Sequence, residues 1–428
     1  MHEKDIIREL AKRYAAVAAD PRNDERRRLW SDHLSLRPTS RTPVLASTGP
    51  WNVWMQDELD RNLRCEDPVL RGLEAQLYWR LLAAEFDDDA IFEPWLTFGA
   101  VAAEPWELLW GIPFVSEHIG TRGSAERHLH VLPDLEDLSQ IKPITHTFDE
   151  EATQRQAAIW HDALGGILPF EITRTLPRCT GGDLSTAIVK MRGIEGAMLD
   201  MVEQPEALHR LLAYLRDGFL AVHAQMVKEG HWTLATHYNQ VMPYAHELPP
   251  PAAHGGPVPT SQLWYHAHAQ DFTGISPAMH EEFILQYQRP LIEQFGLSGY
   301  GCCEDLSRKI DILRKIPNLR YIAVSPMCGF DGLARCVEQI GTDYAISWRP
   351  SPADCICNSW NPERVERILR TGLEITHGTH RHIDLKDIHT VQGDPSRIRK
   401  FCTLARRLSE EYEGGSSRSS LHSSILPS

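Results

Sequence analysis

The last third of the chain alternates between two hydrophobic periods, and this alternation constrains the fold more than any other feature. Segments with apolar residues at helical spacing cover 279–295, 305–316, 331–341, 362–372 and 396–414. Short apolar runs typical of strands lie between them, at 295–301, 319–326, 343–350 and 382–388. Strands that alternate with helices through short connections form a parallel sheet, because each helix carries the chain back to the starting edge.

We therefore predict an α/β fold, specifically a (β/α)8 TIM barrel. The expected strands carry few alternating polar positions, which favours a closed barrel over an open sheet. An open doubly wound sheet remains the alternative, because periodicity alone does not show closure. The predicted organisation is an N-terminal helical extension over 1–90, a barrel catalytic domain over 91–413 and a disordered Ser-rich tail over 414–428.

The first two thirds of the chain give a weaker pattern of the same kind. Helical spacing begins near residue 6, and a second helix follows Asp67-Pro68, with a short strand at Pro43 to Ala46 between them. Residues 91–150 are rich in Trp, Pro and Gly, which predicts irregular segments with short strands. The pattern then predicts helices at 152–164 and 194–228, and strands at 166–173 and 232–240.

Charge and cysteine content exclude several classes of function. The 428 residues carry a formal net charge of -14 and no long basic run, which argues against binding to nucleic acid or to an anionic membrane surface. No apolar run approaches the roughly 18 residues needed to cross a bilayer, and the N-terminus has no apolar signal core. Nine cysteines without an export signal predict a cytoplasmic protein with reduced thiols.

Polar side chains gather at the ends of the expected strands, where parallel barrels place their active sites. The candidates are the thiols and carboxylate of Cys302, Cys303 and Glu304, then Arg349, and then Lys386, Asp387 and His389. An earlier predicted strand ends at His237 and Asn239. Core packing does not require this many polar groups at these positions, so we expect them to meet at one rim.

The double cysteine at 302–303 is the sharpest of these features. Thiolate, carboxylate and imidazole are ligands that suit tetrahedral zinc, so Cys302, Cys303, Glu304 and His389 form the candidate metal set. Asp387 could compete with His389 for that role. The alternative is that both cysteines are small buried side chains, because no recognised metal-binding spacing is present.

Further segments supply candidate substrate contacts or weaker metal signals. His266 and His268 share one face of an extended segment, and Asp271 follows them shortly before a helix. Glu247 lies in a loop after Pro-Tyr-Ala-His and is either a functional acid or a solvated one. The CxC pair at 355 and 357 is a weak metal signal. The tryptophans of the N-terminal half are expected in core packing, although they could also wall a pocket for a flat substrate.

Residues 276–326, 344–353 and 384–398 resemble the uroporphyrinogen decarboxylase-like superfamily, most closely its corrinoid-dependent methyltransferases and O-demethylases. The resemblance implies a (β/α)8 barrel. It also implies methyl transfer from a small donor, such as a methoxylated aromatic compound, to the cobalt of a separate corrinoid protein. The chain lacks the Asp-x-His-x-x-Gly signature of a built-in corrinoid domain, so the corrinoid would arrive on a partner.

The resemblance also implies a zinc site, from which this chain departs. Related methyltransferases hold zinc with a His-x-Cys pair, and here Tyr300 stands at the His position while Cys302 stands at the Cys position. True decarboxylases of this superfamily carry an Arg-rich N-terminal stretch. This chain has WNVWMQDELDR there, with acids where arginines would be needed.

The leading hypothesis is therefore a corrinoid-protein-dependent methyltransferase of the O-demethylase type. Zinc would act as the Lewis acid, and Tyr300, Lys386 or Arg349 would hold the leaving group, with Asp387 as a further catalytic candidate. A decarboxylase or lyase that binds a small acid through Arg349 and Lys386 is the alternative. A non-enzymatic binding module is the third possibility, and a homo-oligomer is compatible with each.

Overall fold

Six parallel strands form the main sheet of the computed structural model, which describes residues 2–118, 120, 126–175 and 183–419. Their order across the sheet is β1-β10-β9-β8-β7-β6, and each neighbouring pair is parallel. The N-terminal strand therefore pairs with the last one, with Leu45 opposite Asp384. The strands are β1 (Val44–Ala46), β6 (Trp264–Ala267), β7 (Leu297–Tyr300), β8 (Leu319–Val324), β9 (Ala345–Trp348) and β10 (Arg381–Leu385).

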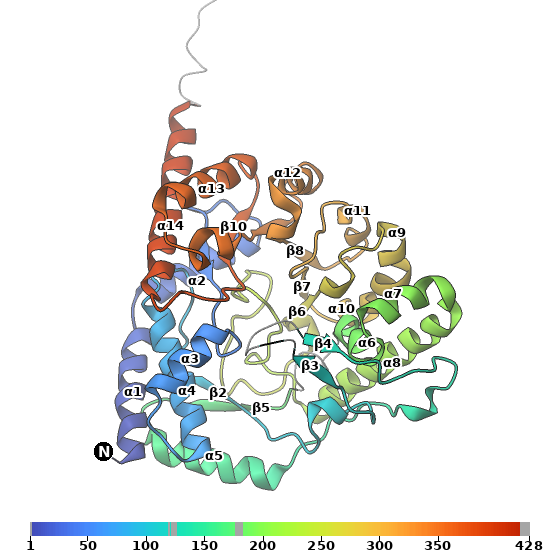
Figure 1. Cartoon of the computed structure of the whole chain (residues 1–428). Coiled ribbons are helices and arrows are strands. Elements are labelled where there is room, and N and C mark those ends of the chain that lie inside the picture. The colour runs from blue at the N-terminus through green and yellow to red at the C-terminus, as the bar shows by residue number, and fades with distance from the viewer. Residues whose placement is uncertain (1, 119, 121–125, 176–182, 420–428) are drawn as a thin grey trace, which may run out of the picture.

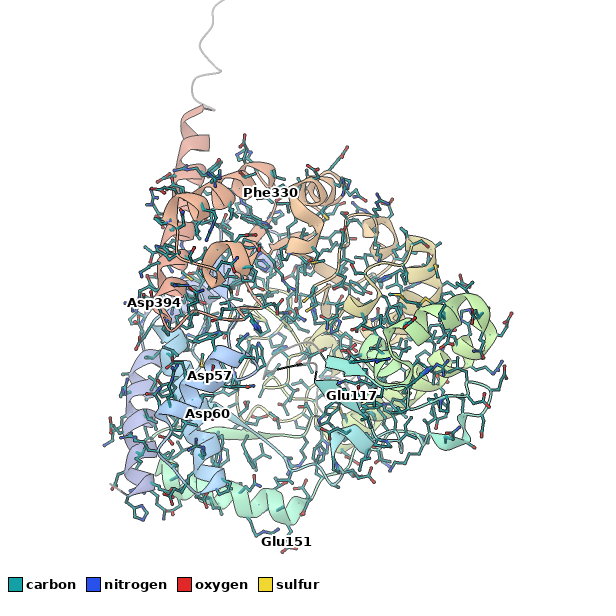
Figure 2. The ribbon with its side chains drawn as sticks, in the orientation of Figure 1. Asp57, Asp60, Glu117, Glu151, Phe330 and Asp394 are labelled. Carbon is teal, nitrogen blue, oxygen red and sulfur yellow. The ribbon has the colours of Figure 1, made fainter. Side chains whose placement is uncertain are left out.

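Helices cover the outer side of this curled sheet (Figure 1). In the C-terminal half each strand is followed by helical turns, as the alternating pattern predicted. Phe330 on α12 and Glu151 on α5 are exposed and lie at the periphery (Figure 2). The helices of this half are α9 (Pro277–His280), α10 (Gln286–Ile292), α11 (Ile310–Leu313), α12 (Gly329–Ile340), α13 (Pro362–Ile375) and α14 (Ser396–Ser419). Two π-helical turns are η5 (Glu281–Leu285) and η7 (Ala353–Cys357).

The N-terminal half contributes further helices and two small sheets. Strands β2 (Leu96–Gly99) and β5 (Phe170–Thr173) pair in parallel, and β3 (Ser116–His118) pairs with β4 (Glu126–His128) in antiparallel fashion. The helices are α1 (Glu3–Ala18), α2 (Arg22–Leu34), α3 (Val53–Asn62), α4 (Pro68–Ala84), α5 (Glu150–Leu164), α6 (Leu184–Arg192), α7 (Ile194–Glu203) and α8 (Pro205–Glu229). Single 3-10 turns are η1 (Trp106–Leu108), η2 (Leu138–Gln140), η3 (Thr260–Gln262), η4 (Gln270–Phe272) and η6 (Pro326–Cys328).

The predicted barrel is therefore confirmed only in its coarser form, an α/β fold with a curled parallel sheet. Among the described residues, β1 does not pair with β2 and β5 does not pair with β6, so strand pairing does not close a ring. Residues 232–240, predicted as a strand, form an irregular segment with one short turn and a single antiparallel β-bridge from Thr233 to Pro257. The Thr236 hydroxyl accepts from the Thr233 amide at 2.9 Å and donates to the Thr233 carbonyl at 2.7 Å. These local bonds take the backbone groups that a strand ladder would need.

Three other boundaries differ from the sequence prediction. The predicted helical extension over 1–90 includes β1, a strand of the main sheet. Helix α13 continues through Gly372 to Ile375, because the glycine lies against the Trp348 ring, where a Cβ atom would overlap the indole. In the predicted tail, α14 extends to Ser419, and 420–428 lie outside the described residues. None of the described helices combines the length and apolar character needed to span a membrane.

Candidate active site

A cavity of about 740 Å³ opens beside the carboxyl ends of the main-sheet strands. The loop after β1 supplies Ser47 and Thr48 to its wall, the loop after β7 supplies the two cysteines, and the loop after β10 supplies Lys386 and Asp387. Carboxyl ends of parallel strands meet at one edge of a sheet, which is where this fold class places its chemistry. The cavity therefore lies where the sequence placed the candidate site.

Glu304 fixes the turn that carries the cysteines. Its buried carboxylate accepts from the amide of Cys302 at 2.7 Å and from the amide of Ala269 at 2.8 Å. Gly301, with a φ of 100°, provides the left-handed conformation that turns the chain directly after β7. Glu304 was predicted as a metal ligand, but here it ties the loops after β6 and β7 together.

The Cys302 thiol lies in an electropositive corner of the cavity. Lys386 Nζ is 3.2 Å from Cys302 Sγ, and Cys303 Sγ is 3.6 Å away. The Cys303 hydrogen bond, followed by the charges of Lys386 and Arg349, holds the pKa of Cys302 well below that of a free thiol, against the opposing effect of burial. Cys303 Sγ in turn lies 3.3 Å from the Asp387 carboxylate. This pair therefore gives one thiolate, on Cys302, and one thiol.

Arg349 is buried next to this corner and directs both of its terminal nitrogens to protein groups. Its guanidinium donates to the Cys302 carbonyl at 2.6 Å and to Gln240 Oε1 at 2.9 Å, and it lies 3.6 Å from Asp384. Lys386 Nζ also donates to Gln240 Oε1, at 2.8 Å. The predicted catalytic Arg349 is thus a buried positioning residue, whereas Lys386 lines the cavity.

A second charged group faces the same cavity from the loop after β6. His268 Nε2 lies 3.2 Å from the carboxylate of Asp183, the N-cap of α6. Although burial opposes the charged form, Asp183 raises the pKa of His268 to about 10, so the imidazole is protonated at neutral pH. Its other nitrogen, Nδ1, is buried without a hydrogen-bond partner among the described residues. His268 Nδ1 is therefore a donor that no described residue accepts.

Aromatic side chains form part of the cavity wall. Trp51 and Trp79 contact edge to face with their ring centroids 6.5 Å apart, and Phe92 lines the same space. Arg80 lies over the Trp79 ring at 5.6 Å. A wall of this kind suits a flat apolar molecule, whose charged or polar end would then reach Lys386 and His268.

The structure brings about half of the predicted site residues together. Cys302, Cys303, Lys386, Asp387, Asn239 and His268 line the cavity. Sequence reasoning missed four residues that line the cavity: Asp183, Gln240, Asp88 and Arg80. Asp183, for example, is indistinguishable in sequence from an ordinary helix N-cap.

The remaining predicted residues lie elsewhere. Tyr300 is fully buried and bonds His280 and Gln288, each at 2.8 Å, so it does not reach the cavity. Glu247 is exposed and holds Ser35 at 2.5 Å and Arg320 at 2.7 Å. Alternation along the backbone explains Tyr300: a strand-end residue faces either the core or the mouth, and the sequence does not say which.

Two further predicted residues face smaller cavities. His237 lines a separate cavity of about 270 Å³ with Trp232 and Tyr265. Burial lowers the pKa of His237 to about 4, so the ring is neutral. Asp271 lines a third cavity, on the side of α7, and burial followed by the charge of Asp183 raises its pKa to about 6.

The predicted zinc ligands do not come together in this structure. His389 is exposed and does not line the cavity, and both carboxylate oxygens of Glu304 already accept backbone amides. The Lys386 ammonium beside Cys302 opposes a second cation there. Among the described residues, Glu304 and His389 are therefore not placed to complete a zinc site with the two cysteines.

Comparison with known proteins gives a likeness in fold. No family model matches the chain, and no curated protein matches it. Among solved structures, a methyltransferase from Methanosarcina mazei is similar over 90% of this chain and 98% of that chain, with a TM-score of 0.53 and 11% sequence identity. At this level of identity the likeness concerns the fold alone.

Proposed function

We propose that this protein is a methyltransferase that moves a methyl group from a methoxylated aromatic compound to the cobalt of a separate corrinoid protein. The observation that carries the proposal is the pairing of two cationic donors, His268 and Lys386, with an aromatic wall in one cavity. The fold likeness to a protein described as a methyltransferase, and the sequence resemblance to corrinoid-dependent O-demethylases, support the same reading.

The chemistry of an aryl methyl ether needs cationic donors of this kind. When the methyl group leaves, the C–O bonding pair stays on the oxygen, and the acceptor supplies the electron pair for the new bond to carbon. The oxygen becomes a phenolate and requires a positive charge or a proton. Hydrogen-bond donors already oriented toward a developing negative charge stabilise the transition state by several kcal/mol, typically about 3 to 4.

Different residues of this chain would bind the aromatic ring and stabilise the leaving oxygen. Trp51 and Trp79 would bind the ring, and His268 Nδ1 would give the leaving oxygen its proton while Asp183 holds the imidazole in place. Lys386 would add a second positive charge, held in position by Gln240 and by the Cys302 thiolate. The corrinoid partner and a zinc ion at Cys302 remain predictions. Metal analysis of the purified protein tests the zinc.

The decisive experiment mixes the protein, without oxygen, with a reduced corrinoid protein and a panel of methoxylated aromatic compounds. We expect a methyl-cobalt absorption spectrum with at least one donor. His268→Gln and Lys386→Met should each lower kcat/KM by about 10²- to 10³-fold, because each removes a donor to the leaving oxygen. His161→Gln, an exposed position on α5, is the matched control. Absence of methyl-cobalt with every donor would count against the proposal.

The same two cations also suit a carboxylate, which keeps a decarboxylase as the second candidate. His268 and Lys386 would then bind an aromatic acid by charge rather than protonate a leaving group. Release of carbon dioxide from such an acid without any corrinoid partner would favour this reading over methyl transfer.

A further inference from the structure

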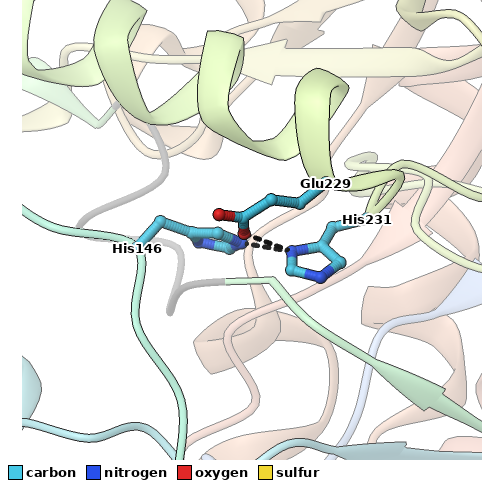
Figure 3. Close-up of side chains that lie close together, drawn as sticks. All are labelled: His146, Glu229 and His231. Atoms are coloured by element: carbon cyan, nitrogen blue, oxygen red, sulfur yellow. Dashed lines mark hydrogen bonds and ion pairs between the residues drawn. The ribbon is translucent and has the colours of Figure 1, made fainter.

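A cluster of three metal-binding side chains lies apart from the active-site cavity. His146, Glu229 and His231 each present a ligand atom, and these atoms all lie within 4.8 Å of one another (Figure 3). His146 Nε2 is 2.8 Å from His231 Nδ1, and His231 Nδ1 is 3.4 Å from Glu229 Oε2. None of the three lines the 740 Å³ cavity. The cluster is therefore separate from the active-site cavity.

Backbone contacts hold the three side chains in place. Glu229 is the last residue of α8, and Gly230, with a φ of 71°, turns the chain so that His231 folds back beside it. The segment with His146 is fixed at the next residue, where the Ala103 amide donates to the Thr147 carbonyl at 3.1 Å. Ligands that are already in position cost little ordering entropy when an ion binds.

A glutamine leaves one carboxylate oxygen of Glu229 facing the histidines. Gln225 Nε2 donates to Glu229 Oε1 at 2.8 Å and to the His146 carbonyl at 2.9 Å. Oxygen Oε2 then faces His231. An outer hydrogen bond of this kind orients a metal ligand.

The local charge also favours a cation. The C-terminus of α8 presents the negative end of its helix dipole to the cluster. Arg174 is a positive charge that acts on His231. It is paired with Glu150 through two hydrogen bonds of 2.7 Å, so its charge is compensated.

We infer that His146, Glu229 and His231 form a zinc site that joins α8 to the segment before α5. Two imidazole nitrogens and one carboxylate oxygen are a donor set that zinc accepts, and no thiolate is involved. Glu229 is exposed, so water can complete the coordination. This inference does not depend on the proposed function.

The test titrates Zn²⁺ into the full chain after chelator treatment, in a Cys302→Ser, Cys303→Ser background that removes the active-site thiols. We expect one equivalent bound, and a melting temperature that rises with Zn²⁺. The Co²⁺ form should show bands of nitrogen and oxygen ligation without thiolate charge transfer. His231→Gln should weaken Zn²⁺ binding by about 100-fold or more.

Glu229→Gln provides the variant that should fold normally, because its side chain is exposed and the bond from Gln225 can be kept. It should weaken Zn²⁺ binding while leaving the melting temperature in chelator unchanged. The exposed His161→Gln is the control and should bind Zn²⁺ like the parent. The inference is overturned if the parent binds no Zn²⁺. It is also overturned if Glu229→Gln and His231→Gln both bind as tightly as the parent.

Discussion

At the scale of single residues, the site is organised by charge pairs that the fold assembles. Cys302 and Lys386 are 84 positions apart, yet their sulfur and nitrogen atoms are 3.2 Å apart. Asp183 and His268 lie on different elements and form an ion pair in which His268 Nε2 is 3.2 Å from the Asp183 carboxylate. Each pair fixes the charge of a group that faces the cavity, which is the condition for acid–base or electrostatic catalysis at neutral pH.

The Cys302 thiolate gives a prediction that chemical labelling can check. At pH 7, iodoacetamide should modify Cys302 well before the fully buried Cys402, whose pKa burial raises. Lys386→Met removes the adjacent positive charge and should raise the pH midpoint of Cys302 alkylation by about 1 to 3 units. Mass spectrometry of labelled peptides measures the rate, with the exposed Lys400→Met as the control. An unchanged midpoint would contradict the assigned contact.

Removal of Asp183 gives a second prediction at this scale. Because Asp183 raises the pKa of His268 to about 10, the pair stabilises the fold at pH 7, and that contribution is lost as pH rises through 10. Asp183→Asn leaves a buried imidazole without its counter-charge and should lower the free energy of unfolding by about 3 to 5 kcal/mol at pH 7. Urea unfolding at pH 7 measures the loss. A variant as stable as the parent would show that the pair is not formed.

At the scale of elements, packing overrides local preference. Glycine is a poor helix former, yet Gly372 lies inside α13 because the Trp348 indole on β9 occupies the space a side chain would fill. The helix can lie this close to the sheet only at a residue without a Cβ atom. The residue that sequence reasoning took as the helix end is therefore a packing contact between helix and strand.

A pair of glycine substitutions tests this explanation. Gly372→Ala should lower the free energy of unfolding by about 1 to 3 kcal/mol, because overpacking against Trp348 outweighs the gain in helix propensity. Gly72→Ala in α4 should instead raise it by up to about 1 kcal/mol, since a Cβ there meets no atom within 4 Å. Denaturant unfolding of both variants gives the comparison. Equal effects of the same sign would refute the packing argument.

At the scale of the whole molecule, several histidines are buried in the neutral form, and one pair of them joins helix α2 to the main sheet. His33 on α2 and His382 on β10 share a hydrogen bond of 2.8 Å in the interior. Burial lowers the pKa of His33 to about 3, and that of His280 behind β7 also to about 3. The unfolded chain would bind protons at these positions near pH 6.5, whereas the folded chain excludes them.

Stability should therefore fall as the solution is acidified. The folded pKa values lie below the ordinary value of 6.5, so the stabilisation is present above pH 6.5 and is lost between that pH and about 3. His280→Gln removes one such group and should reduce the slope of unfolding free energy against pH by about 1.4 kcal/mol per unit between pH 6 and 4. Urea titrations across that range measure it, and the exposed His161→Gln should leave the slope unchanged. A slope as steep in His280→Gln as in the parent would contradict the assignment.

Hydrophobic periodicity by itself determined the alternating strands and helices of the C-terminal half and the parallel sheet they form. Each of those elements can be recognised within about ten residues of sequence, because burial of one face sets the spacing of its apolar residues. The same pattern placed Cys302 and Lys386 near strand ends, where the cavity lies.

Only the tertiary structure decided which of those polar groups meet. In the folded chain Tyr300 points into the core and His389 is exposed to solvent. The Glu304 carboxylate joins the loops after β6 and β7 by accepting hydrogen bonds from backbone amides. The fold also brings Asp183 to His268 and gathers His146, Glu229 and His231 from separate segments. The physical reason is that such contacts depend on loop paths and on the direction each side chain takes, and neither leaves a periodic trace in the sequence.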